Sequence, residues 1–306
     1  MRYVVTGADG FIASHLCERL LADGHEVVAF CHYHGALTLS RLREHARLSV
    51  VWGECQSYDT LDQMPRDGIE GVFHLAAAVD VAWSLRLGDT LCDETYYFHQ
   101  NVRGTEGVLR FAASRPARCL VMSSSEVYGT PDFVPISEQH RISPQSPYAA
   151  SKKYADVTAW RMAQAGYDVV IARPFNTYGP RQSPRSVIGK MCIHAARGSG
   201  PVELGDVETK RDWVYVTDTV DGLVRIMASG RRGETYNLGT GRAVTVREAA
   251  QMIGVEYVSG RGQDRGAAEV LILQADATKA RETLGWEPKV RLEDGLAMTV
   301  ESYRHG

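Results

Sequence analysis

Three polar residues near the middle of the chain have the types and the spacing of an acid–base site. Tyr148 and Lys152 stand four residues apart in PYAASKKYAD, so they lie on one face if this segment is helical. A tyrosine with its ordinary pKa of about 10 is a poor base at neutral pH, and a neighbouring ammonium group lowers that pKa. Ser124, in SSSEVYG, is placed to hydrogen-bond to the same reacting oxygen. We therefore predict proton transfer at Tyr148, assisted by Lys152 and Ser124.

A glycine-containing loop at the start of the chain has the pattern of a phosphate-binding turn. In YVVTGADGFIASHL, an apolar strand leads into Gly7-x-x-Gly10-x-x-Ala13 and then into a helix. Gly7 permits the tight turn, Gly10 lets the backbone approach a pyrophosphate, and the small Ala13 lets the helix pack closely on the strand. The N-terminus of such a helix attracts phosphate. We therefore predict a dinucleotide site that includes Gly7, Gly10, Phe11 and Ile12.

The residues after the second predicted strand leave the choice between NAD and NADP open. An acidic residue there would bind the 2′-hydroxyl of NAD and an arginine would suit the 2′-phosphate of NADP, but the chain has Cys31 and His32. Arg41 or Arg43 could reach a 2′-phosphate, although a solvent-exposed helix face is the favoured explanation of both. Glu54, after the third predicted strand, is a candidate contact for the adenine or its ribose. We predict NAD, with His32 and Glu54 near its adenosine half, and NADP as the alternative.

The elements that must position these residues alternate as in βαβ units. Apolar β-branched runs predict strands, and segments of helical period separate them. The predicted strands are Tyr3–Thr6, Glu26–Cys31, Leu48–Gly53, Gly71–His74, Arg118–Met122 and Asp168–Ala172, and the predicted helices cover residues 11–25, 98–117 and 146–167. Right-handed crossovers arrange such units into a doubly wound parallel sheet that binds ligands beyond the carboxyl ends of its strands. The predicted fold class is therefore α/β, with a Rossmann-type domain over residues 1–172.

The pattern changes after Arg173-Pro174, where glycine and proline separate shorter elements. We predict that residues 173–306 form mainly a smaller C-terminal α/β substrate lobe, and that parts of residues 213–240 rejoin the first domain. Its later predicted helices cover residues 245–253, 276–286 and 291–303.

Composition indicates an ordinary globular protein. The chain has 306 residues, of which 44% are hydrophobic and 23% charged, and its formal net charge is −3. These values argue against a disordered or fibrous chain and give no reason to expect nucleic acid or an anionic membrane as partner. The start of the chain lacks a signal-peptide pattern, so we expect a cytoplasmic protein. The 6 cysteines contain no C-x-x-C, and the cluster at 31–34 lacks a distant fourth ligand, so neither a disulfide framework nor a metal is predicted.

Seven stretches together carry a family resemblance: TGADGFIASHL, FHLAAA, NVRGT, SSSEVYG, PYAASK, RPFNTYGPRQ and RDWVYVTD. On these motifs the chain resembles the extended short-chain dehydrogenase/reductase family of nucleotide-sugar enzymes over essentially its whole length. The resemblance implies a tightly held NAD(P) that takes a hydride from C4 of the sugar, with Tyr148, Lys152 and Ser124 in the roles derived above. It also implies a homodimer that pairs through the helices at 91–114 and 147–165.

The resemblance also implies binding roles for further residues. Asn101 supports the active site, Asn176 and Arg211 hold the substrate diphosphate, and the loop at 78–84 lies where a hexose rests. The complete candidate set adds Leu75, Ala76 and Ala77 for the cofactor and Val81, Trp83, Ser84, Arg181, Val187 and Arg265 for the substrate. His74 is interpreted as a buried, hydrogen-bonded histidine and not as a catalyst. The chain departs from the family in having Ala13 as its third small residue and no acid after the second strand.

Glu126 bears on which reaction occurs, because oxidation at C4 acidifies the hydrogen on C5. SSSEVYG is similar to the hydroxyl-Ser-Glu triplet of GDP-mannose 4,6-dehydratases and of the NAD-dependent 4,6-dehydratases of bacterial legionaminic-type sugar pathways, in which the glutamate removes that proton. Ser125 stands where dTDP-glucose dehydratases have aspartate, so Ser125 or a water must help the C6 hydroxyl leave. We therefore favour a nucleotide-sugar 4,6-dehydratase.

Three alternatives stay open. In a nucleotide-sugar 4-epimerase, Glu126 would be a bystander. In a UDP-glucuronate decarboxylase, Arg181 or Arg185 would face the sugar carboxylate. A non-enzymatic dinucleotide-binding protein is a remote alternative, because such a protein could dispense with the reactive tyrosine that this chain retains.

Overall fold

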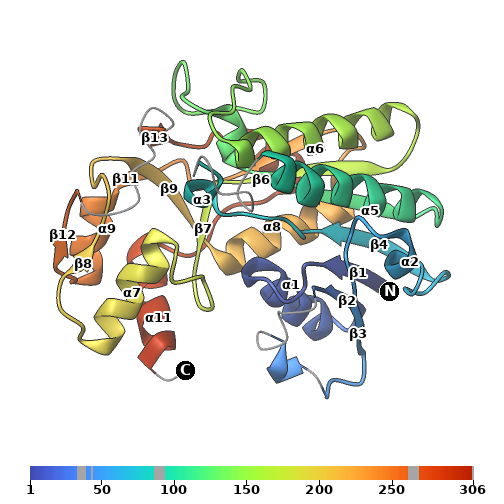
Figure 1. Cartoon of the computed structure of the whole chain (residues 1–306), viewed down its shortest axis with the longest axis horizontal. Coiled ribbons are helices and arrows are strands. Elements are labelled where there is room, and N and C mark those ends of the chain that lie inside the picture. The colour runs from blue at the N-terminus through green and yellow to red at the C-terminus, as the bar shows by residue number, and fades with distance from the viewer. Residues whose placement is uncertain (33–38, 43, 86–93, 261–268, 305–306) are drawn as a thin grey trace.

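The computed structural model describes residues 1–32, 39–42, 44–85, 94–260 and 269–304, together with the side chains of all of these except Arg41, Trp83 and Glu94. A seven-stranded parallel sheet forms its centre, and a smaller group of strands and helices lies beside it (Figure 1). This arrangement confirms the predicted α/β Rossmann-type fold.

The large sheet has the doubly wound strand order. In spatial order its strands are β10 (Thr235–Leu238), β6 (Val169–Pro174), β5 (Arg118–Met122), β4 (Ile69–His74), β1 (Arg2–Thr6), β2 (Glu26–Cys31) and β3 (Leu48–Trp52). Neighbouring strands are parallel throughout, with Val4 opposite both Val28 and Val72. The carboxyl ends of β1, β4 and β5 therefore meet at one edge of the sheet.

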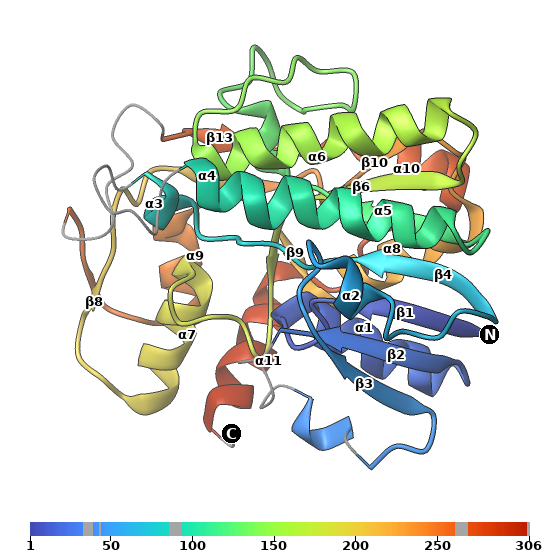
Figure 2. The ribbon, with the colours of Figure 1, turned by 45° about the vertical axis from the view of Figure 1, so that its right-hand side comes forward.

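Helices cover both faces of this sheet, as Figure 2 shows. Helices α5 (Gly104–Ala113) and α6 (Pro147–Gln164) lie on one face, and α1 (Phe11–Ala22) and α8 (Val216–Ser229) lie on the other. Neighbouring residues of a strand point to opposite faces, so Val4 and Val72 pack in one apolar cluster while Val5 and Phe73 pack in the other. Both faces are thereby buried, which holds the strand ends in fixed positions.

The remaining elements form the smaller group. Its main sheet joins β7 (Asn176–Tyr178), β9 (Lys210–Tyr215), β11 (Ala243–Thr245) and β13 (Ile272–Leu273), and β8 (Val202–Glu203) pairs with β12 (Tyr257–Val258). Its helices are α7 (Val187–Arg197), α9 (Val246–Ile253) and α11 (Leu292–Arg304). Helix α10 (Thr278–Leu284) lies instead beside β10 of the large sheet (Figure 2). Between β9 and β11 the chain returns to the large sheet through α8 and β10. The division into domains at residue 173 stays a prediction.

Short helical segments connect these elements. They are α2 (Tyr58–Leu61), α3 (Val81–Ser84), α4 (Glu94–Tyr97) and the 3₁₀ turns at Ser40–Leu42 and Ser125–Tyr128. Phe98–Arg103 is a π-helical turn that joins α4 to α5, a local widening that the apolar spacing of the sequence did not predict. Within the described residues, no helix combines the length and the apolar composition needed to cross a bilayer.

Candidate functional site

The loop between β1 and α1 has the geometry of an anion-binding turn. Gly7 has φ of +65°, and a Cβ there would lie 2.7 Å from the Cα of Ala76, so only glycine fits this position. Gly10 precedes α1, which has no side-chain cap and no acidic residue in its first turn. The first amides of a helix lack partners within the helix. A dinucleotide pyrophosphate therefore fits the turn that Gly7, Gly10, Phe11 and Ile12 form.

Asn101 connects the end of β4 to the helix that carries Tyr148. It lies in the π-helical turn and is almost completely buried. Its Oδ1 accepts a hydrogen bond from the amide of Ala78 at 2.7 Å, and its Nδ2 donates to the Ala78 carbonyl at 3.0 Å and to the Ser151 hydroxyl at 2.8 Å. Because Ser151 is adjacent to Lys152, Asn101 fixes the segment after β4 against α6.

His74 belongs to the same hydrogen-bonded network. The Thr105 hydroxyl donates to the Asn101 carbonyl at 2.6 Å, so it must accept from His74 Nε2, which lies 3.0 Å away. The Nδ1 atom then accepts from the Thr6 hydroxyl at 2.8 Å. Burial lowers the pKa of His74 to about 3, with a smaller contribution from Lys152, so the ring is neutral. His74 is thus a buried link between β1 and the π-helical turn.

The start of α6 places Tyr148 and Lys152 at the carboxyl end of β5. Ser146 caps this helix through its hydroxyl, which accepts the Ala149 amide at 3.1 Å, and Pro147 occupies the first turn. Tyr148 is 7% exposed and Lys152 is 4% exposed. The Lys152 ammonium donates to the carbonyl of Met122 at 2.8 Å, which ties α6 to the last residue of β5.

Burial changes the pKa values of both residues. It raises the pKa of Tyr148 to about 12; hydrogen bonding with Ser124 acts in the opposite direction, and the charges of Glu126 and Asp156 add to the rise. Burial also lowers the pKa of Lys152 to about 8, against the attraction of Asp156. Burial of Tyr148 thus acts against the lowering of its pKa that was predicted from Lys152, and the role of Lys152 stays a prediction.

Ser124, Ser125 and Glu126 follow β5 in a single 3₁₀ turn. The Ser124 hydroxyl caps this turn by accepting the Glu126 amide at 3.2 Å. Ser125 is buried, and Glu126 is half-buried. Because the charge of Glu126 and the hydroxyl of Ser124 both act on Tyr148, the structure brings these three groups together. The hydroxyl of the neighbouring Ser123 is buried without a hydrogen-bond partner.

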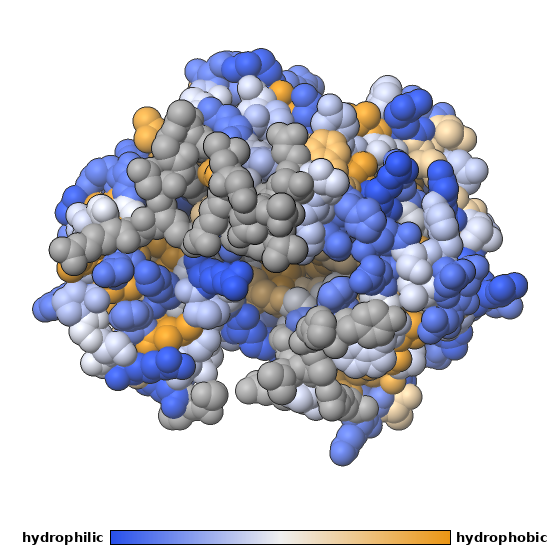
Figure 3. Space-filling model, in the orientation of Figure 1, coloured by the Kyte–Doolittle hydropathy of each residue, from blue (hydrophilic) through white to orange (hydrophobic). Residues whose placement is uncertain are grey.

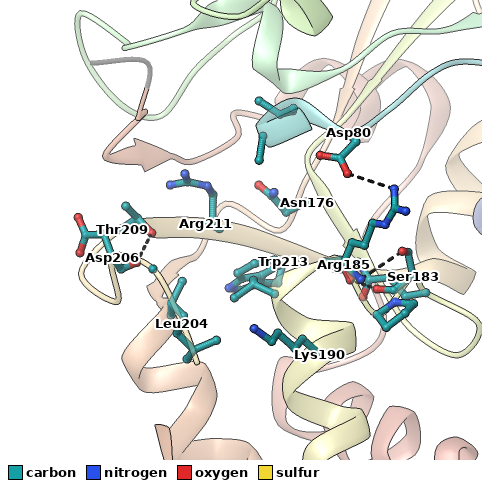
Figure 4. A pocket seen from close by; sticks show the side chains of 18 of the residues that line it. Asp80, Asn176, Ser183, Arg185, Lys190, Leu204, Asp206, Thr209, Arg211 and Trp213 are labelled. Carbon is teal, nitrogen blue, oxygen red and sulfur yellow. Dashed lines mark hydrogen bonds and ion pairs between the residues drawn. The ribbon is translucent and has the colours of Figure 1, made fainter. Parts of the chain in front are cut away.

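A cavity of about 520 Å³ lies between the large sheet and the smaller group of elements. Figure 3 shows the surface hollowed near its centre, between the part with α7 and α9 and the part with the large sheet. Arg211, Asn176 and Trp213 line the cavity (Figure 4). Asn176 Oδ1 and Trp213 Nε1 are buried without hydrogen-bond partners, while Arg211 donates to Glu269 at 2.6 Å. The cavity thus offers a ligand both a hydrogen-bond acceptor, Asn176 Oδ1, and a hydrogen-bond donor, Trp213 Nε1.

The predicted substrate residues have different positions. Val81, Asn176, Val187 and Arg211 line the cavity, whereas Ser84 is buried and donates to the Val81 carbonyl at 2.6 Å. Arg265 and the side chain of Trp83 lie outside the described residues.

Arg181 is directed away from the cavity. Its guanidinium makes two hydrogen bonds to the Glu18 carboxylate of α1, the longer of them 2.8 Å, and its φ is +69°. This pairing fastens the loop before α7 to α1. The structure therefore does not bring Arg181 to the other predicted substrate residues.

Sequence reasoning missed Asp80, Lys190 and Trp213 as lining residues of the cavity. Lys190 follows Val187 by three residues on α7, so helical spacing could have placed both on one face. Asp80 lies within the loop at 78–84 where the hexose was expected, but the sequence did not single it out as a contact. Trp213 stands two residues after Arg211 on β9, hence on the same face of the strand.

The predicted cofactor residues near the adenosine end also lie close together. His32, which is exposed, follows β2, and its Nε2 atom lies 3.6 Å from a carboxylate oxygen of Glu54, which follows β3. Leu75 is buried, and Ala76 and Ala77 are half-buried beside the glycine loop. Among the residues that the structure describes, no group of three or more His, Cys, Asp or Glu side chains could hold a metal ion.

Comparisons with known proteins agree with this architecture. The GDP-mannose 4,6 dehydratase family model matches residues 4–299. The chain is 35% identical to a UDP-glucose 4-epimerase of Mycolicibacterium smegmatis over 100% of its own length and 99% of that protein's, and 33% identical to a dTDP-glucose 4,6-dehydratase of Streptomyces griseus over 98% and 93%. Its fold matches the dTDP-glucose 4,6-dehydratase DesIV of Streptomyces venezuelae, solved with NAD bound, with a TM-score of 0.90 at 31% identity over 100% and 98% of the two chains. The chain belongs to the GDP-mannose 4,6-dehydratase family of nucleotide-sugar enzymes.

Proposed function

We propose that the protein is an NAD-dependent nucleotide-sugar 4,6-dehydratase. The observation that carries this proposal is the position of Glu126, whose charge acts on Tyr148 from the same turn that holds Ser124. A carboxylate beside the reacting tyrosine is suited to remove a proton from the carbon next to the one being oxidised. An epimerase that oxidises and reduces C4 does not need such a base.

The chain's own residues supply the proton transfers of this reaction. Bound NAD would supply the hydride acceptor for C4 of the sugar and the hydride donor for C6. Tyr148 takes the proton of the C4 hydroxyl, while Ser124 hydrogen-bonds to the same oxygen. The Lys152 ammonium is held in place by its hydrogen bond to the Met122 carbonyl. Its positive charge stabilises the ionised form of Tyr148. Glu126 removes the C5 proton, and the C6 hydroxyl leaves with a proton as water. When the hydride reaches C6, C5 regains a proton that has exchanged with solvent, so the sugar loses one H₂O overall.

The cavity supports a nucleotide diphosphate sugar as the substrate. Arg211 supplies a positive charge for the diphosphate, and the unpartnered Oδ1 of Asn176 can accept a hydroxyl or amide proton of the ligand. Val81 and Val187 give the cavity apolar wall area for a sugar ring. Gly7, Gly10 and the amides of Phe11 and Ile12 receive the pyrophosphate of the cofactor.

A 4-epimerase is the second candidate, because the UDP-glucose 4-epimerase of Mycolicibacterium smegmatis is 35% identical to this chain. In that reaction Tyr148, Lys152 and Ser124 keep their roles and Glu126 takes no part.

The experiment is incubation of the purified, NAD-loaded protein with a panel of nucleotide sugars in D₂O, followed by mass spectrometry. We expect a product about 18 mass units lighter than the substrate, once the mass of one deuterium incorporated at C5 has been subtracted. Glu126→Gln should lose most of the turnover and of the solvent exchange at C5, on the order of 10²-fold. Glu282→Gln, an exposed residue on α10, is the matched control. The protein would be an epimerase and not a dehydratase under two results. The product would be an isomer with the mass of the substrate, and Glu126→Gln would react as fast as the unchanged protein.

We further propose that the protein is a homodimer. Helices α5 and α6 lie side by side on one face of the sheet, and α6 exposes large apolar side chains there, with Tyr154 at 52% and Trp160 at 51%. Large exposed apolar side chains on one helix are typical of a subunit interface. Sedimentation equilibrium should give twice the chain mass for the unchanged protein and a monomer for Trp160→Glu. A monomeric unchanged protein would refute the dimer. The cytoplasmic location stays a prediction from the sequence.

A further inference from the structure

An ion pair forms part of the cavity wall. Arg185 Nη1 lies 3.6 Å from Asp80 Oδ2, and both residues line the cavity. Asp80 precedes α3 and Arg185 precedes α7, so the two side chains come from different segments of the chain and point toward one another, as Figure 4 shows. The Asp80 side chain is 22% exposed and that of Arg185 is 75% exposed. The carboxylate is therefore the more firmly placed member of the pair.

The backbone of Asp80 is held next to the candidate catalytic tyrosine. The Tyr97 hydroxyl donates to the Asp80 carbonyl at 2.6 Å, and the amide of Ser84 donates to the same carbonyl at 3.0 Å. Tyr97 is fully buried, and its ring packs edge-on against the ring of Tyr148, with 6.4 Å between their centroids. A single side chain thus separates Asp80 from Tyr148. Under the proposed function, this end of the cavity holds the sugar.

Each of the described cationic side chains that line the cavity has a partner within the protein. Arg211 is paired with Glu269, and the Lys190 ammonium donates to the Glu203 carbonyl at 2.6 Å. Arg185 is the lining cation whose charge is opposed by Asp80. A second carboxylate brought to Arg185 would lie close to Asp80, and two like charges at such a distance repel in a partly enclosed site.

We propose that Asp80 makes the cavity select nucleotide sugars with an uncharged hexose and reject those with a hexuronate. This inference rests on the proposed function only in placing the sugar beside Tyr148. Arg185, neutralised by Asp80, can still donate hydrogen bonds to hydroxyl groups of a neutral sugar. A hexuronate must either displace Asp80 from Arg185 or accept its repulsion, and selection by an unfavourable contact of this kind is a common source of specificity. The same pairing disfavours decarboxylation of a glucuronate.

The test compares the dissociation constants of UDP-glucose and UDP-glucuronate, and of their dTDP counterparts, for the NAD-loaded full chain by titration calorimetry. For the unchanged protein we expect the neutral sugar to bind about tenfold more tightly or better. Asp80→Asn should reduce this preference by about tenfold, chiefly by tightening the hexuronate. Arg185→Met should weaken the hexuronate further. Asp206→Asn removes another carboxylate of the same cavity, on the side away from Asp80 in Figure 4, and should leave the preference unchanged.

Equal binding of the two sugars by the unchanged protein would overturn the inference, and so would an unchanged preference in Asp80→Asn. If no sugar of either nucleotide binds, the placement of the sugar beside Tyr148 fails and the inference fails with it. Binding is read from the heat of titration and dehydration from the product mass, so the two proposals separate. A shifted preference in a protein that dehydrates nothing supports the role of Asp80 and refutes the dehydratase.

Discussion

The two ends of the candidate site are built on different physical principles. Around Tyr148 and Lys152, nearly complete burial displaces both pKa values, and a backbone carbonyl holds the lysine. Across the cavity, Arg185 and Arg211 are instead paired with the carboxylates of Asp80 and Glu269. Desolvation governs the first region and charge pairing governs the second. Substitutions at the first end should therefore change the rate of the chemical step, whereas those at the second should change affinity and substrate choice.

The largest effect should come from Tyr148. Tyr148→Phe keeps the ring, and with it the packing against Tyr97, but removes the hydroxyl that takes the proton of the C4 hydroxyl. We expect kcat to fall on the order of 10²–10⁴-fold with a nearly unchanged KM, because an acid–base group contributes in the transition state. Tyr154→Phe, on the exposed side of the same helix, is the control. Near-normal turnover in Tyr148→Phe would show that Tyr148 takes no part in the reaction. The proposed difference between the two ends of the site would then be wrong.

A smaller effect should separate Arg211 from Arg181. Arg211→Met removes a charge from the cavity wall, so we expect KM for the nucleotide sugar to rise about 10–100-fold with little change in kcat, the usual magnitude for a hydrogen bond to a charged group. Arg181→Met only releases the loop before α7 from Glu18, and KM should change by less than about threefold. Steady-state kinetics of both variants checks this order. A larger KM effect for Arg181 than for Arg211 would restore Arg181 to the substrate site.

The smallest effect concerns stability and pH at Lys152. Its pKa is about 8 in the folded protein, below the ordinary lysine value of 10.5, so the unfolded chain binds more protons between these two values. The contribution of Lys152 to the free energy of unfolding should therefore rise from pH 8 to pH 10, by about 2 kcal/mol. Urea denaturation of the unchanged protein and of Lys152→Met at both pH values gives this contribution as a difference. Buried cysteines act in the opposite direction but cancel in that comparison. An equal pH response in the two proteins would contradict the desolvation of Lys152.

The sequence predicted those parts of the site that depend on local spacing. The turn from β1 through Gly7 and Gly10 into α1 is contiguous in the chain, and the steric need for glycine acts within a few residues. Tyr148 and Lys152 are likewise one helical turn apart. Neither prediction required knowledge of how distant segments pack.

Other features depend on segments that are far apart in the sequence. Arg181 was expected at the substrate, yet its guanidinium reaches Glu18, 163 residues away, because the loop before α7 folds against α1. The direction of the pKa change at Tyr148 depends on the closure of α6 over β5, which removes the hydroxyl from water. The pairing of Asp80 with Arg185 depends on the approach of two different segments of the chain. No local pattern specifies these distances.

By itself the amino-acid sequence determined the parallel α/β sheet, the phosphate turn and the order of the acid–base residues, because apolar periodicity, glycine sterics and helical spacing act over short stretches. Only the tertiary structure decided which charges neutralise one another and which groups lose their water. Both outcomes depend on the distances between elements, and these arise when the helices pack against the sheet and the smaller lobe closes beside it.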